Sequence, residues 1–449
     1  MVVGQTVCLD GTHVAGPRTG LIDKVCSKHN LRVAFERVKK NGGSAGVDHQ
    51  TIERFESRRE ENLDHLAQSL RDGSYQPQAL KRAWATKPGQ KEKRPLGVPI
   101  VRHQVAQTAL LQVLEPIFER DLAKHSYGFR SGRGCQDALH RVEALLKTGY
   151  TWVVDADLRS YFDTIPHSPL QDLVKAKVSD HRLLDRWDDY LKQGVMETVK
   201  PWTPVPGTPQ GVVISPWLSN IYLDPLDQLM SEAGFEMVRS ADDFVILGRS
   251  PAEAQDALEV VQQWTVSAGL TLHPDKTQIV DATQPGGFGF LGYHLERGHR
   301  WLRRKSLKRF KGAIRAKTRR SNGYSLEAIV LDVNRVLKGW LEYFKHSHKT
   351  TFSRLTSWLR MRLRSILRKR RGGRGRGRGL DHQRWPNAFF TELGLFSLAA
   401  AHILVCQSSR RRTTDRRAVC GKTARPVRRG VEPGMQPVLP TSIRSLFLS

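Results

Sequence analysis

The hydrophobic pattern at the start of the chain predicts two amphipathic helices. Apolar residues at positions 31, 33, 34, 35 and 38 recur with helical spacing and stop at Asn41-Gly42-Gly43. A second helix is predicted from Ile52 to Leu70, ended by Asp72-Gly73. Residues 1–20 show no periodicity, so the predicted fold begins after them.

The middle of the chain alternates between extended and helical patterns. Residues 79–101 predict two short strands around a basic turn at 87–91, followed by a long helix from Gln104 to Asp121. Residues 151–158 form an apolar, β-branched run that ends in acids, as in a buried strand. Residues 236–247 predict two strands on either side of Asp242-Asp243. This alternation predicts a core of α+β class.

The last third of the chain is predicted to be helical at first and then irregular. Beyond Arg303, apolar residues at 333, 336, 337, 340, 341 and 344 have helical spacing. The stretch from Arg371 to Gly379 is rich in glycine and arginine, which predicts a flexible cationic linker or an RNA-contacting arm. Residues 403–449 have weak periodicity, which predicts extended or disordered chain.

The charge of the chain is concentrated in one stretch. The 449 residues carry a formal net charge of +28, and residues 301–380 hold 25 lysines and arginines against three acids, a net +22. A solvated face without function is the alternative, but such a concentration favours a polyanionic partner, above all nucleic acid. The five cysteines are scattered and support neither a disulfide framework nor a zinc site. Without a signal peptide or an apolar run of about 18 residues, we expect a cytoplasmic protein with no membrane partner.

Two predicted strand ends carry carboxylates suited to phosphoryl transfer. Transfer to a nucleotide uses two divalent ions about 3.5–4 Å apart, and Mg²⁺ prefers hard oxygen ligands. Adjacent aspartates in a surface turn are common and usually have no function. Around Asp242-Asp243, however, the apolar residues 237–238 and 244–247 indicate a buried hairpin, where charges must be paired or bound to metal.

The order of these elements resembles the motifs of reverse transcriptases, specifically those of group II intron-encoded proteins and their bacterial relatives. The resemblance covers about residues 30–295. It rests on Arg94-Pro-Leu-Gly-Val-Pro-Ile100, Ser126-Tyr-Gly-Phe-Arg-Ser-Gly-Arg133, the Asp-x4-Phe-Asp motif at 157–163, Pro209-Gln-Gly-Val-Val-Ile-Ser-Pro-Trp-Leu-Ser-Asn220, Ala241-Asp242-Asp243, Lys276 and Gly289-Phe-Leu-Gly292. The six motifs, with Lys276 set aside, stand in the family's order, which does not arise by chance.

The resemblance implies an RNA-directed DNA polymerase and assigns roles to matching positions. Asp157, Asp242 and Asp243 would be the catalytic residues that bind two Mg²⁺ ions, with Mn²⁺ as a substitute, and the Leu158 carbonyl would add a ligand. The implied nucleotide-binding residues are Lys87, Arg94, Leu158, Phe162, Gln210, Gly211 and Lys276. Phe162 would exclude a sugar 2′-hydroxyl, or alternatively belong to the core. The implied substrates are dNTPs and a duplex of RNA template and DNA primer.

Residues 303–345 resemble the maturase, or thumb, region of the same family, and residues 384–398 resemble a short element that follows it in some members. The implied partner is group II intron RNA or another structured RNA. The expected RNA-binding residues are Arg303, Arg304, Lys305, Lys308, Arg309, Lys311, Arg368, Lys369 and Arg370. The aromatic residues Trp340, Tyr343 and Trp358 would either join this surface or lie in the core.

The predicted fold is therefore a right-hand polymerase. Its expected parts are an N-terminal extension (1–78), fingers and palm (79–295), a helical thumb or maturase domain (296–370) and a basic C-terminal region (371–449). Two features depart from the family: Ser240 replaces the tyrosine usual before Ala-Asp-Asp, and no Cys-rich His-Asn-His endonuclease pattern is present. Two alternatives stay open: an RNA-binding splicing maturase with weak or lost polymerisation, and a relative recruited to DNA repair or defence.

Overall fold

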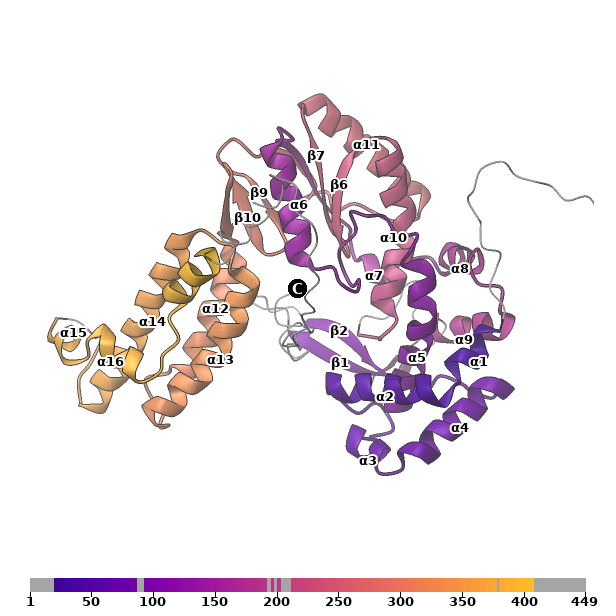
Figure 1. The fold of residues 1–449 in the computed structure, drawn as a ribbon, viewed down its shortest axis with the longest axis horizontal. Coiled ribbons are helices and arrows are strands. Elements are labelled where there is room, and N and C mark those ends of the chain that lie inside the picture. Colours follow the sequence, from indigo (N-terminus) through magenta and orange to yellow (C-terminus); the bar gives the residue numbers. More distant parts are fainter. Residues whose placement is uncertain are drawn as a thin grey trace, which may run out of the picture.

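The computed structural model describes residues 20–86, 93–191, 195–197, 200–202, 211–377 and 379–407. Figure 1 shows how the elements are arranged. The helices are α1 (Leu21–Val25), α2 (Lys28–Asn41), α3 (Ile52–Glu56), α4 (Arg59–Asp72), α5 (Val101–Phe118), α6 (Cys135–Lys147), α7 (Tyr161–Thr164), α8 (His167–Lys175), α9 (His181–Leu191), α10 (Ser215–Glu232), α11 (Pro251–Ser267), α12 (Arg304–Lys317), α13 (Leu326–Phe344), α14 (Lys349–Arg370), α15 (Leu380–Arg384) and α16 (Asn387–Glu392). The strands are β1 (Leu80–Thr86), β2 (Lys93–Val98), β3 (Trp152–Asp157), β4 (Val195–Glu197), β5 (Lys200–Trp202), β6 (Glu236–Ser240), β7 (Asp243–Gly248), β8 (Gln278–Asp281), β9 (Phe288–Phe290), β10 (Tyr293–Glu296) and β11 (His299–Leu302).

The central sheet has the strand order β6-β7-β3-β8, and all its neighbouring strands are antiparallel. Helices α10 and α11 contact one face, and α6 and β9 contact the other (Figure 1). Apolar residues therefore alternate between two cores along each strand: Val154 and Phe244 belong to the first, and Val153 and Val245 to the second. Because both faces are buried, a slip of one residue would exchange the two sets, so the register is strongly specified.

The N-terminal helices pack on the first core together with a second sheet, β2-β1-β4-β5. Helix α2 lies along α5 and ends at Gly42, whose φ of +65° is the left-handed conformation that glycine readily adopts. The single helix predicted from Ile52 to Leu70 is wrong, since the chain forms α3 and α4 with a break at Arg58 (φ −127°, ψ 42°). The long helix predicted from Gln104 begins earlier, at Val101.

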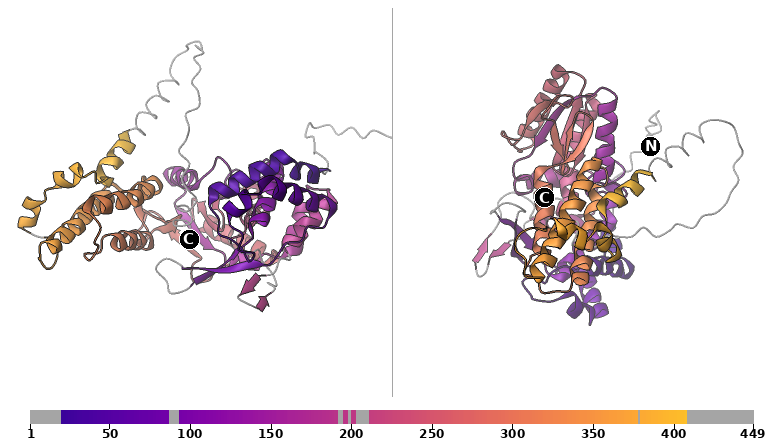
Figure 2. Two further views of the ribbon diagram at one scale, coloured as in Figure 1. Left: turned by 90° about the horizontal axis from the view of Figure 1, so that it is seen from below. Right: turned by 90° about the vertical axis from the view of Figure 1, so that its left-hand side faces the viewer.

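The second core joins the central sheet to the cationic helices. A three-stranded sheet, β11-β10-β9, leads into α12, α13 and α14, and these helices share apolar contacts with α6 and with one face of the central sheet. The resulting helical module, α12 to α16, lies to one side of the sheets in Figure 1 and in the left view of Figure 2. Trp340 is buried in this core, Trp358 packs against it half-buried, and Tyr343 lies at its edge.

The glycine- and arginine-rich stretch folds back on α14. The Arg368 side chain donates to the Arg374 carbonyl at 2.8 Å, and an added Cβ on Gly377 would lie 2.8 Å from the Arg364 Cβ. Residues 371–377, predicted as a flexible cationic linker or an RNA-contacting arm, thus lie against α14. Residues 398–407 are helical, so the prediction of irregular chain from 403 is wrong for its first five residues, and 408–449 lie outside the described residues. Of the helices that can be described, none is long and apolar enough to cross a bilayer.

Candidate active site

Two neighbouring strands bring the predicted carboxylates together. In the antiparallel pair β3–β7, Asp157 is the direct partner of Asp243, and such partners have Cα atoms about 4.5–5.5 Å apart. Strands β6 and β7 are joined by the two-residue turn Ala241-Asp242, in which Ala241 has a φ of +61°. Asp157 therefore meets Asp242 and Asp243, which are distant from it in sequence, at one end of the central sheet.

Asp157 is paired with a cation from the loop before β8. The Lys276 ammonium donates to the Asp157 carboxylate, and 57% of the lysine side chain and 34% of the aspartate side chain are exposed. The Asp157 carbonyl accepts from the His273 amide at 2.7 Å, which fixes the backbone at the end of β3. The predicted site residue Lys276 therefore lies at the aspartates, in contact with one of them.

The Asp243 carboxylate is the most perturbed group of the site. Burial raises its pKa to about 7, and the neighbouring Asp242 acts in the same direction. The Arg303 guanidinium and the Leu291 amide oppose this shift in the pKa, the amide by donating to Asp243 Oδ2 at 3.3 Å. A half-buried carboxyl with an acidic neighbour favours a compensating cation, because desolvation disfavours its charged form.

Arg303, one of the predicted RNA-binding residues, lies near the acids of the central sheet. Its guanidinium donates to the Gly289 carbonyl at 2.8 Å and lies so close that a Cβ on Gly289 would be 2.0 Å from Arg303 Nε. It also opposes the raised pKa of Asp155, a carboxylate two residues before Asp157 that burial perturbs. Arg303 therefore compensates acids near the end of the sheet that carries the three aspartates, and the Gly289-Phe-Leu-Gly292 segment holds it there.

The donor set fits a hard divalent cation in chemistry, although it is not arranged as a closed cage. Across the described ranges, no three His, Cys, Asp or Glu side chains converge closely enough to hold a metal ion. The three aspartates nevertheless supply only carboxylate oxygens, the ligands that Mg²⁺ prefers, and Lys276 already holds positive charge at Asp157. A divalent ion would take the place of that ammonium group.

The residues predicted to hold the nucleotide are described only in part. Lys87 and Gln210 lie outside the described residues, and of Arg94 the structure gives the backbone position in β2, opposite Ala85. Gly211 has a φ of +97°, and an added Cβ would lie 3.0 Å from the Gly97 carbonyl of β2. The glycine thus allows two backbones to approach where a larger residue would be strained.

Two further predicted residues flank Asp157. Leu158 is buried, so its side chain belongs to the core, and its backbone forms an isolated β-bridge with Leu272. Phe162 is half-buried on the same core, with its ring edge-on to Tyr161 at a centroid distance of 5.5 Å. Both the core and the sugar-contact interpretations of Phe162 are compatible with this position.

The remaining predicted RNA-binding residues divide into exposed and anchored groups. Arg304, Lys305, Lys308 and Lys369 are exposed, whereas Arg309 is half-buried, which lowers its pKa. Three others contact groups of the module itself: Lys311 lies over the Trp358 ring, Arg368 pairs with Asp381 at 2.6 Å, and Arg370 donates to the Tyr324 carbonyl.

Sequence reasoning missed further cations on α12 and beyond. Arg315 and Arg319 are exposed and continue the line of Arg304 and Lys308 at intervals of four and seven residues. Helical spacing was the signal that could have found them. Positive charge accumulates here. Burial, and after it the charges of Arg315 and Arg320, lower the pKa of the Arg362 guanidinium.

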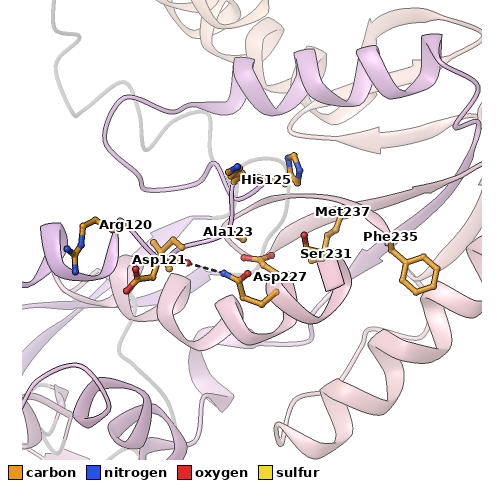
Figure 3. A pocket seen from close by; sticks show the side chains of 11 residues that line it. Arg120, Asp121, Ala123, His125, Asp227, Ser231, Phe235 and Met237 are labelled. Carbon is orange, nitrogen blue, oxygen red and sulfur yellow. Dashed lines mark hydrogen bonds between the residues drawn. The ribbon is translucent and has the colours of Figure 1, made fainter. Parts of the chain in front are cut away.

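The structure also contains a pocket on another side of the same sheet (Figure 3). Its volume is about 310 Å³, and its lining includes Asp227, Ser231, His125 and Met237 but none of the three aspartates of the site. Asp227 and the buried Arg239 form an ion pair that sequence reasoning did not identify. The signal that could have found it is the charge of Arg239 directly after the apolar residues Met237 and Val238 of β6.

Comparison with known proteins assigns this arrangement to a family. Residues 85–295 match the model described as Reverse transcriptase (RNA-dependent DNA polymerase), and residues 307–385 match Group II intron, maturase-specific domain. The chain is 33% identical to the Group II intron-encoded protein LtrA of Lactococcus lactis over 213 residues, which are 47% of this chain and 35% of LtrA. It thus spans about a third of the length of that relative.

A second relative is covered more completely. The chain is 31% identical to Protein YkfC of Escherichia coli over 297 residues, which are 58% of this chain and 77% of YkfC. Among solved structures, a chain of the Partial Cas6-RT-Cas1–Cas2 complex is 26% identical, covers 56% of this chain and 42% of that chain, and has a TM-score of 0.36. The motifs, the two family models and these relatives together show that the chain belongs to the group II intron-encoded family of reverse transcriptases and maturases.

Proposed function

We propose that the chain is an RNA-directed DNA polymerase that adds dNTPs to the 3′-hydroxyl of a primer in a Mg²⁺-dependent reaction. The observation that carries this proposal is the register of β3 and β7, which sets Asp157 opposite Asp243 and next to the Ala241-Asp242 turn. Members of this family typically use divalent metal ions.

Asp157, Asp242 and Asp243 would hold two Mg²⁺ ions, or Mn²⁺ in their place. When bound, such ions activate the attacking hydroxyl and stabilise the charge on the leaving oxygens. The raised pKa of Asp243 supports this assignment, because a partly desolvated carboxylate gains from a cation beside it. Lys276 holds the Asp157 carboxylate in place and would be free to approach the leaving pyrophosphate once released from it.

The nucleotide would bind between the β1–β2 hairpin and the end of the central sheet. Gly211 supports this arrangement, since its backbone lies against Gly97 of β2. Lys87, Arg94 and Gln210 would bind the triphosphate and line the template, with the Leu158 carbonyl as a further metal ligand. Phe162 would then exclude a 2′-hydroxyl and favour deoxynucleotides.

Helices α12, α13 and α14 would form the thumb or maturase domain and bind intron RNA. The charge of the region and the exposed line of Arg304, Lys308, Arg315 and Arg319 support this proposal. Residues 1–78 would form the N-terminal extension, 79–295 the fingers and palm, and residues from 371 onward the basic C-terminal region. The anchored Arg303, Arg368 and Arg370 would stabilise the module more than they contact RNA.

Primer extension on an RNA template tests the proposal. Asp242→Asn removes a ligand charge and should lower the extension rate on the order of 1000-fold, the equivalent of several kcal/mol of transition-state stabilisation. Asp256→Asn, which neutralises an exposed acid on α11, is the matched control and should extend at the wild-type rate. Equal extension by Asp242→Asn and wild type would refute the proposal.

A second candidate function is RNA binding without useful polymerisation, as in a splicing maturase. The net +22 of residues 301–380 and the absence of a tyrosine at position 240 favour it. In this case Asp242→Asn would support splicing of the intron RNA as well as the wild type does. Arg304→Glu combined with Lys308→Glu would abolish splicing in both cases, so primer extension by the wild type, which only the polymerase proposal expects, distinguishes the two functions.

A further inference from the structure

A buried ion pair lies directly behind the turn that carries Asp242. Arg239 of β6 is fully buried, and its Nε donates to Asp227 Oδ1 at 2.8 Å and to Oδ2 at 3.0 Å. Asp227 comes from α10, and only 5% of its side chain is exposed. Removing two charges from water is costly, and replacing such pairs by apolar residues is often neutral or stabilising. Stability alone therefore does not account for this pair.

The rest of the guanidinium reaches the turn itself. Arg239 Nη1 donates to the Ala241 carbonyl at 3.0 Å and to Asn220 Oδ1 at 3.0 Å. Ala241 is the residue with a φ of +61°, a conformation that residues with a Cβ seldom adopt. The arginine thus holds the carbonyl of a residue in an unfavourable backbone conformation, immediately before Asp242.

A second segment closes on the turn from the opposite side. The Asn220 side-chain amide donates to the Gly128 carbonyl at 2.7 Å, and a Cβ on Gly128 would lie 2.2 Å from the Ala241 backbone nitrogen. The Tyr127 amide donates to the Arg239 carbonyl at 2.8 Å. Gly128 and Asn220 both belong to segments that resemble family motifs. Gly128 lies against the backbone of Ala241, and Asn220 contacts Gly128 and Arg239.

We infer that Arg239, oriented by Asp227 and Asn220, is a positioning residue that fixes the Ala241-Asp242 turn so that Asp242 and Asp243 face Asp157. The planar guanidinium donates in several directions at once, to a carboxylate, an amide and a peptide carbonyl. A lysine at this position would keep the charge but could not make all of these bonds. The inference rests on the proposed polymerase function for its kinetic consequence, but not for its structural one.

The structural consequence is tested by hydrogen exchange of the metal-free protein. In Arg239→Lys the amides of residues 236–248 should exchange about tenfold faster than in the wild type, because the turn opens more often. Arg364→Lys is the matched control, since Arg364 is also buried and donates to the Trp385 carbonyl at 2.9 Å, far along the chain in the helical module. Its exchange in residues 236–248 should equal that of the wild type.

The kinetic consequence is tested by primer extension with the same variants. Arg239→Lys should lower kcat at least tenfold, with the KM for the primer–template unchanged within about twofold, since the duplex-binding surface is intact. Arg364→Lys should keep the wild-type kcat even where its thermal midpoint falls. Asn220→Ala, which removes one partner of the guanidinium without touching the ion pair, should repeat the kcat loss and guards against misfolding of the lysine variant.

The outcomes separate the inference from the proposed function. Unchanged exchange in both Arg239→Lys and Asn220→Ala overturns the inference, as does a kcat loss that Arg364→Lys shares. Faster exchange in both variants, combined with no extension by the wild type, would support the positioning role of Arg239 and refute the polymerase proposal instead.

Discussion

Substituting Ser240 with tyrosine should destabilise the protein, even though tyrosine is the residue usual at this position in the family. The Ser240 residue is 6% exposed, and its Oγ lies 4.0 Å from the Cys135 Sγ of α6. The Cys135 thiol is hydrogen-bonded to the Tyr343 side chain of α13. Tyr343 in turn donates to the Leu291 carbonyl at 3.1 Å. A thiol and a phenol ring thus occupy the space beside position 240.

The magnitude follows from the cost of overpacking. Adding a ring to a filled site costs about 1–3 kcal/mol, because neighbours must leave their preferred rotamers. Truncating the neighbour with Tyr343→Ala is itself destabilising, but it opens space where the new ring would go. The double variant should therefore be more stable than the sum of the single effects predicts, with a coupling free energy of about 1 kcal/mol or more.

The assay is urea denaturation of the wild type, the two single variants and the double variant, followed by tryptophan fluorescence. Additive losses, within about 0.5 kcal/mol, would show that Tyr343 does not fill the space of a residue-240 ring and would refute the reasoning. Primer extension by the same four proteins adds a second readout. We expect Ser240→Tyr to extend more slowly than the wild type, because the displaced neighbours border Asp243.

Three further predictions concern other parts of the molecule. Lys276→Met should change stability by less than about 1 kcal/mol, since the pair with Asp157 is largely exposed, and should lower the Mg²⁺ concentration for half-maximal extension; a higher concentration would show that the lysine assists rather than competes. Arg304→Gln combined with Lys308→Gln should reduce the slope of log affinity against log salt by roughly 1.4 to 1.8 for a structured RNA, and an unchanged slope would remove both residues from the interface. Burial lowers the pKa of His103 from 6.5 to about 3, so the unfolded chain binds more protons than the folded chain below pH 6.5. The free energy of unfolding should therefore fall by up to about 1.4 kcal/mol per pH unit from pH 6.5 toward 3. His103→Gln should flatten this pH dependence, measured by urea denaturation between about pH 7 and pH 5.

The positions of the three aspartates could be predicted because local patterns decide them. The strand at 152–157 and the hairpin at 236–248 are apolar on both faces, which identifies them as central strands and leaves the register little freedom. Acids at the end of such strands stand out against the apolar run. The break at Arg58 lies in the polar run 56–62, which interrupts the apolar spacing between Phe55 and Leu63 but contains no glycine or proline to mark a helix end.

The supporting network could not be predicted, because its members are recognised only by what they touch. Arg303 lies in the most cationic stretch of the chain, and charge density alone assigned it to RNA, whereas its guanidinium is held at Gly289 near Asp155 and Asp243. Composition indicates the electrostatic field around a region but not the direction in which one side chain points. The pairing of Arg239 with Asp227 depends likewise on the packing of α10 against β6.

The two sides of the catalytic turn are held by different means, and this difference has a functional consequence. Toward α10, Arg239 holds the backbone of the turn; toward α13, the Leu291 amide holds the Asp243 carboxylate while the Leu291 carbonyl accepts from Tyr343. Because Tyr343 belongs to the helical module, a shift of α13 would reach Asp243 through a single residue. We therefore expect a shift of the module to change the geometry of the carboxylates, and a substitution at Tyr343 to change the rate of primer extension.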